Sequence, residues 1–217
     1  MAKFSANPGK VHFEGLVHLL RYIRDNKTLG LKYYADLNDA PVTDILRQAN
    51  IKTKNHLMAF SGYSWQDCPD TGRSTGAYII FYQGGPIDNV THVPGPVAQY
   101  SEESEYNAVC TAGMALAHFR MLINEFLNED PDMVPKEAPL IVLDSKSAMC
   151  MSKNGKDTKH TRHIERRMHF VKNGEKCKMH KIGWCEGGLQ LEDIGTKNVI
   201  EPDLTPRMKY IMVRLDN

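Results

Sequence analysis

Three acidic residues stand where an α/β fold would present them to a ligand. Asp144 ends the apolar run PLIVLD, Glu105 lies in the first turn of a predicted helix, and Asp193 lies in a short helix predicted after the strand-like segment KIGWC. Reactive groups on open α/β sheets collect at the carboxyl ends of strands and at adjacent helix starts, so these acids could converge at one sheet edge. Clustered carboxylates without His or Cys partners suit Mg²⁺ or Mn²⁺.

The same acids have a simpler interpretation. An acidic residue at a helix start also interacts favourably with the helix dipole, and on residue types alone this structural role is the favoured one. A zinc site is not expected, because the spacing of the histidines and cysteines in the second half of the chain matches no zinc template.

A mixed sheet with helices on both faces is predicted to position the acids. Residues 11–26 have apolar side chains at helical spacing, so we expect an amphipathic helix that buries one face. The hairpin between the second and third main strands is expected to turn at Gly84-Gly85. Strands are predicted at residues 30–37, 55–64, 76–83, 87–93, 139–145 and 181–185, and further helices at 41–48, 101–126, from about 145, at 161–172 and at 188–197.

Composition limits the class of protein. The chain has 217 residues, and its 41% hydrophobic content with 16 glycines is usual for globular domains, which excludes disorder, collagen and coiled coil. No apolar run approaches the roughly 18 residues of a membrane helix, and the start MAKFSANPGK has no signal-peptide core, so we expect an intracellular protein with no membrane partner. Five cysteines at scattered spacing predict free thiols.

Charge is distributed unevenly along the chain. The net charge is +1, yet residues 152–181 contain ten Lys or Arg against three acids. A basic segment on a mildly acidic body is typical of a phosphate-backbone contact. A solvated helix face is the alternative.

Five motifs occur together in one order: SGYSWQDCPDTGRSTGAY, SEESEYNAVCTAGMALAHF, LIVLDSKSAM, TKHTRHIERRMHFVK and LEDIGTK. In order and approximate spacing they resemble the ribonuclease H domain that follows reverse transcriptase in copia-type LTR retrotransposons. The segment VHFEGLVHLLRYIRDNKTLGLKYY also resembles that family's connection between polymerase and ribonuclease H. The resemblance covers about residues 8–200.

The resemblance implies an architecture. It implies a ribonuclease H-like α/β fold, a mixed five-stranded sheet with helices on both faces, plus an N-terminal helix and strand from the connection segment. The implied divisions are a connection segment at 1–56, packed on the main domain, a ribonuclease H-like domain at 57–200 and a C-terminal tail at 201–217.

The resemblance also implies hydrolysis of the RNA strand of RNA/DNA hybrids by a two-metal mechanism, with Mg²⁺ as cofactor and Mn²⁺ as its substitute. Its catalytic and metal-binding acids fall on Glu105, Asp144 and Asp193, the last of which stands before Thr196-Lys197 where the family has Ala-Asp-x-x-Thr-Lys.

One position departs from the family pattern. Where the family has Tyr-Ser-Asp-x-(Asp/Ser)-Trp, this chain has Phe-Ser-Gly-Tyr-Ser-Trp, so Gly62 replaces the metal-bridging aspartate. We therefore expect impaired activity, which the change Gly62→Asp should restore. The alternative is a catalytically inactive module that binds nucleic acid or acts as a structural connection.

The implied partners are an RNA/DNA hybrid and the reverse transcriptase domain of a parent polyprotein, in cytoplasmic or nuclear retrotransposon particles. Recognition is expected by hybrid shape and 2′-hydroxyls. Arg73 has a second interpretation, because it can instead fix the turn before the next strand. The host and the oligomeric state stay open. The predicted nucleic-acid-binding residues are Arg73, Lys159, Arg162, Arg166 and Arg167.

Overall fold

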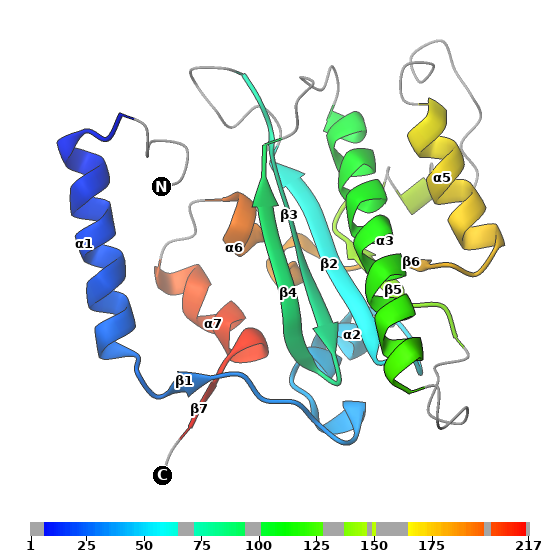
Figure 1. Cartoon of the computed structure of the whole chain (residues 1–217), viewed down its shortest axis with the longest axis horizontal. Helices are drawn as coiled ribbons and strands as arrows, with labels where there is room; N and C mark the ends of the chain where they lie inside the picture. Colours follow the sequence, from blue (N-terminus) through cyan, green and yellow to red (C-terminus); the bar gives the residue numbers. More distant parts are fainter. Residues whose placement is uncertain are drawn as a thin grey trace.

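The molecule is built around one five-stranded mixed sheet (Figure 1), with strand order β4-β3-β2-β5-β6. The structure is a computed structural model that describes residues 7–64, 72–93, 101–127, 137–146, 149–150, 165–197 and 201–215. Strand β2 pairs antiparallel with β3 and parallel with β5. The sheet confirms the mixed five-stranded architecture expected of a ribonuclease H-like domain. The strands are β2 (Leu57–Ser64), β3 (Thr75–Tyr82), β4 (Gly85–His92), β5 (Leu140–Leu143) and β6 (Lys181–Trp184).

The central strand is apolar on both sides. Every residue of β2 except Ser64 is buried, as expected for a strand covered on both faces. The β3–β4 hairpin turns at Gln83 and Gly84, one residue earlier than predicted, and both have positive φ (52° and 70°), as a type I′ turn requires.

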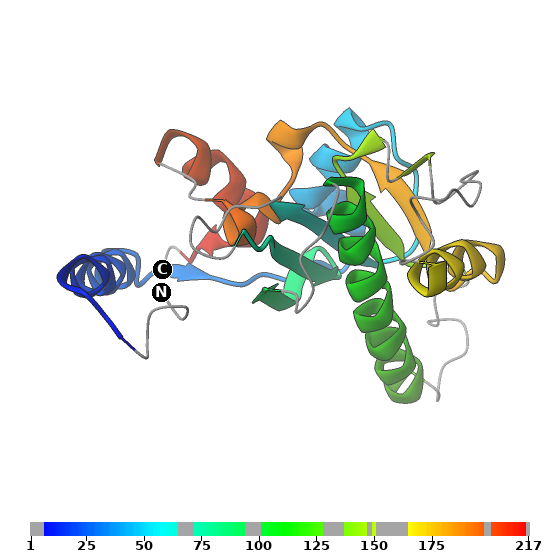
Figure 2. The ribbon, with the colours of Figure 1, turned by 90° about the horizontal axis from the view of Figure 1, so that it is seen from above.

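Helices cover both faces of the sheet (Figure 2), as predicted. On one face α3 (Ser101–Phe126) and α5 (Glu165–Lys176) pack on alternate residues of the strands, including Leu57 and Ala59. On the other face Met58 and Phe60 join a second core with η2 (Leu37–Asp39), α2 (Val42–Gln48) and part of the C-terminal segment. The alternation of side chains along β2 therefore divides the core into two layers.

The N-terminal helix forms where predicted but lacks the predicted buried face. Helix α1 (Lys10–Asp25) has no buried residue, and six of its large apolar side chains are 43–76% exposed: Val11, Phe13, Leu16, Leu19, Leu20 and Ile23. Both ribbon views show it apart from the sheet (Figures 1 and 2). The strand predicted at 30–37 is reduced to β1 (Leu29–Gly30), which pairs with β7 (Val213–Arg214).

The segment predicted as a C-terminal tail contains α7 (Glu201–Ile211), which packs Tyr210 and Ile211 against the second core. The predicted helix at 188–197 divides into η4 (Gly187–Leu189) and α6 (Asp193–Thr196). Most of the helix predicted from residue 145, and residues 161–164, lie outside the described residues. In the described part of the chain, no helix is long and apolar enough to span a membrane.

Candidate active site

Three predicted acids come from three elements that meet at one edge of the sheet. Asp144 directly follows β5, Glu105 lies in the first turn of α3, and Asp193 begins α6. Because β2 and β5 are parallel, Gly62 near the end of β2 lies at the same edge as Asp144. The charges of Asp144 and Asp193 act on Glu105, so the structure brings the three acids into one cluster. Their roles as metal ligands stay a prediction.

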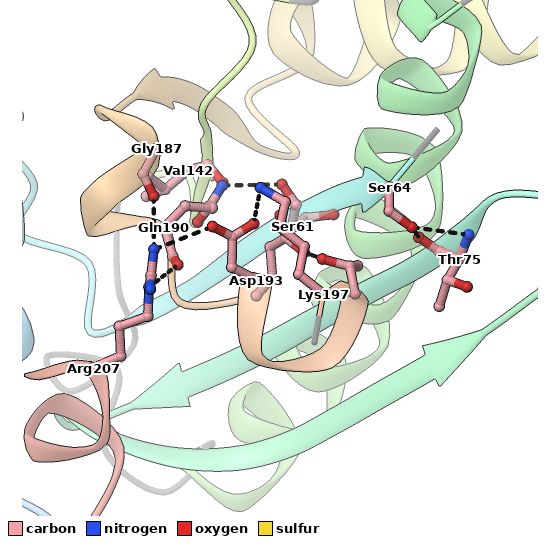
Figure 3. A network of polar contacts seen from close by, with 11 residues as sticks. Ser61, Ser64, Thr75, Val142, Gly187, Gln190, Asp193, Lys197 and Arg207 are labelled. Carbon is pink, nitrogen blue, oxygen red and sulfur yellow. Dashed lines mark hydrogen bonds and ion pairs between the residues drawn. The ribbon is translucent and has the colours of Figure 1, made fainter. Parts of the chain in front are cut away.

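Asp193 is almost completely buried and bound by two basic side chains. It is 4% exposed, Lys197 Nζ lies 2.5 Å from its Oδ1, and Arg207 Nη2 lies 3.2 Å from its Oδ2 (Figure 3). Arg207 also donates to the carbonyl oxygens of Gly187 and Gln190. Gln190 Nε2 in turn donates to the carbonyl oxygens of Ser61 and Val142, which ties the loop before α6 to β2 and β5.

Glu192 is a fourth acid in the cluster, and sequence reasoning missed it. It is 2% exposed, and Thr196 Oγ1 donates to its Oε2 at 3.0 Å. The charges of Asp193, Asp144 and Glu105 all act on Glu192. The sequence did contain an indication of this acid, because Glu192 stands where the family motif has Ala.

Burial and mutual repulsion disfavour the ionised acids. Burial, followed by the charge of Asp144, raises the pKa of Glu105 to about 8. Burial, and then the charge of Asp193, raises the pKa of Glu192 well above its usual range. The pKa of Asp144 is also raised, first by burial and then by Asp193, although Lys197 opposes the rise. Perturbed carboxylates of this kind are typical of functional sites.

Lys197 supplies positive charge inside the cluster. Burial lowers its pKa, but the hydrogen bond to Asp193 and the charges of Asp193, Asp144 and Glu192 outweigh burial and raise that pKa. The Lys197 ammonium therefore stays charged at neutral pH, beside the carboxylates that a metal ion would use.

The donor chemistry of the cluster fits a hard divalent cation. All four acids provide oxygen ligands, and Glu105 Oε2 is a buried oxygen without a hydrogen-bond partner. Among the described residues, no three His, Cys, Asp or Glu side chains are placed to hold a metal ion as they stand. Because Lys197 already pairs with Asp193, a metal ion that binds Asp193 would compete with Lys197.

The predicted nucleic-acid-binding residues are described only in part. Arg73 is exposed just before β3, whereas Arg167 donates through Nη1 to Asn107 Oδ1 and so joins α5 to α3. Lys159, Arg162 and the side chain of Arg166 lie outside the described residues.

No family model matches the chain. The Retrovirus-related Pol polyprotein from transposon TNT 1-94 of Nicotiana tabacum is 26% identical to it over 185 residues, 84% of this chain and 12% of the polyprotein. The Secreted RxLR effector protein 161 of Plasmopara viticola is 26% identical over 112 residues, 52% of this chain and 68% of the effector. The chain thus spans only a small part of the tobacco polyprotein.

Solved structures of ribonucleases H1 are similar to this chain at low identity. RNase H1 from the halophilic archaeon Halobacterium salinarum has a TM-score of 0.45 and 14% identity, covering 64% of this chain and 93% of that one. LC11-RNase H1 in complex with an RNA/DNA hybrid has a TM-score of 0.48 and 11% identity, covering 68% and 99%.

Proposed function

We propose that this chain is the ribonuclease H-type domain of a copia-type retrotransposon polyprotein and that it cuts the RNA strand of RNA/DNA hybrids with the help of Mg²⁺. The observation that carries the proposal is the convergence of Glu105, Asp144 and Asp193, from three separate elements, into one partly buried cluster. The likeness to the tobacco Pol polyprotein over 84% of the chain supports the polyprotein context.

The acids and the two basic residues of the cluster have separate roles. Glu105, Asp144 and Asp193 would hold the cations, which activate water and stabilise the charge that develops on the leaving oxygen when they are bound. Arg207 orients Asp193 by binding its Oδ2. Lys197 neutralises the Asp193 carboxylate while the cluster is free of metal and must leave it when a cation binds.

A second candidate function is a non-catalytic module that binds nucleic acid. Two observations favour it: β2 has glycine rather than an acid at Gly62, and Lys197 already pairs with Asp193. In this function the cluster would have a structural role only.

Cleavage of a hybrid with a labelled RNA strand separates the two functions. Because Gly62 replaces an expected metal ligand, we expect weak Mg²⁺-dependent cutting that EDTA abolishes and that the variant Asp193→Asn lacks. Equal cutting by wild type and Asp193→Asn would indicate a contaminating nuclease, and hybrid binding without any cutting would favour the non-catalytic module.

A further inference from the structure

The side chain of Glu192 occupies the space next to Gly62. A Cβ atom added at Gly62 would lie 2.0 Å from Glu192 Oε1 and 2.6 Å from its Cδ, closer than real Cβ atoms approach other atoms. Glycine at position 62 thus makes room for the Glu192 carboxylate, which lies beside β2 at the same sheet edge as Asp144. The two unusual residues of this chain are therefore spatial neighbours.

Local structure holds the Glu192 carboxylate in this place. Glu192 is the N-cap residue of α6, and the preceding Leu191 is fully buried in the second core. Thr196 Oγ1 then fixes Oε2 by a hydrogen bond of 3.0 Å. A buried and anchored carboxylate loses little conformational entropy when it binds a ligand, which is the requirement for a preorganised site.

The acids of the cluster outnumber its basic groups. The described residues place four acids (Glu105, Asp144, Glu192 and Asp193) close to two basic groups (Lys197 and Arg207), which leaves two negative charges when all the acids are ionised. Buried carboxylates are costly unless they are paired or coordinate a metal. One divalent cation would supply the two positive charges that allow all four acids to be ionised.

We propose that Glu192 is a metal-binding residue of this cluster and provides, from the N-cap of α6, the carboxylate that β2 lacks at Gly62. The inference rests on the proposed function, because it assumes that the cluster binds a divalent cation. It changes the expected outcome of Gly62→Asp: the new side chain would collide with Glu192 rather than restore the site.

Direct Mn²⁺ binding tests the role of Glu192 without reference to cleavage. Electron paramagnetic resonance of free Mn²⁺ should show affinity at least about tenfold weaker for Glu192→Gln than for wild type, a loss of about 1.4 kcal/mol or more. Glu125→Gln, which removes an exposed acid of α3, is the matched control and should bind like wild type. Equal affinity of wild type and Glu192→Gln would overturn the inference and leave the proposed function standing. No Mn²⁺ binding by wild type would overturn both.

A double variant, in which the carboxylate is on β2 instead of at Glu192, tests whether the two side chains compete for one space. Gly62→Asp alone should lower Tm by about 5 °C, because an inserted side chain has no room. Gly62→Asp combined with Glu192→Ala moves the carboxylate back to β2, and should recover Tm and bind Mn²⁺ within about threefold of wild type. The inference fails if Gly62→Asp lowers Tm equally with and without Glu192→Ala, since the two side chains would then not compete for one space.

Discussion

At the residue scale, Glu105 gives the cluster a pH dependence that unfolding can measure. Its pKa is about 8 in the folded protein against an ordinary value of 4.5, so between these values the folded state holds a proton that the unfolded chain has released. The free energy of unfolding should therefore fall as pH rises from about 4.5 to about 8 in metal-free buffer.

The side chain of the variant Glu105→Gln cannot ionise. Its free energy of unfolding should therefore fall less than that of wild type over the same pH range. Urea unfolding at pH 5 and pH 8 in EDTA, for wild type and variant, measures the difference. An identical pH dependence in both proteins would contradict a raised pKa for Glu105.

The acids of the cluster were predictable to different degrees. Asp144 and Glu105 followed from simple rules, because a short apolar run ends at one and a long helical period begins near the other. Glu192 was missed because its neighbour Asp193 matched the family motif, and the sequence does not reveal that the N-cap residue of α6 fills space beside β2. Arg207 was missed for a similar reason, since its partners Gly187, Gln190 and Asp193 belong to other elements.

At the element scale, Arg207 attaches α7 to the site. Its side chain is 14% exposed and binds the buried Asp193 carboxylate together with two backbone carbonyls. The change Arg207→Met should lower the free energy of unfolding by about 3 kcal/mol, because it removes one of the two cations paired with the buried Asp193 carboxylate and the hydrogen bonds to two backbone carbonyls.

The matched control is Lys209→Met on the same helix. Lys209 is exposed and lies over the ring of Tyr210, so its loss should change stability by no more than about 0.5 kcal/mol. Urea unfolding of both variants is the measurement. Similarly small decreases in the free energy of unfolding for both variants would show that Arg207 does not anchor α7.

The elements that sequence predicted best are those with a strong local pattern. Strands β2 and β3 are rich in aromatic and apolar residues, and α3 has a long helical period, so all three formed as expected. Helix α7 was not predicted, because Pro206 lies inside it and proline is read as a helix breaker. The amphipathic pattern of α1 predicted a helix correctly, but a local pattern cannot show whether another surface covers its apolar face.

At the scale of the whole molecule, binding of an RNA/DNA hybrid should depend steeply on salt. Each neutralised phosphate contributes a log–log slope of about −0.9, with duplex DNA as the guide. Reversing the charge of Arg73 and Arg166 together should make the slope less steep by roughly two phosphates. Arg21→Glu, on the exposed surface of α1, is the control and should leave the slope unchanged.

Fluorescence anisotropy with a labelled hybrid over a series of salt concentrations measures the slope. An unchanged slope in the Arg73/Arg166 variant would show that neither Arg73 nor Arg166, the latter in the basic segment, contacts a phosphate.

A crystal structure of the chain soaked in Mn²⁺ would show whether the acidic cluster binds a divalent cation. We expect an anomalous peak about 2.0–2.6 Å from carboxylate oxygens of Glu105, Asp144 and Asp193, joined by Glu192, with the Lys197 ammonium displaced from Asp193. A map without a peak at this edge of the sheet, in which Lys197 still pairs with Asp193, would contradict this expectation.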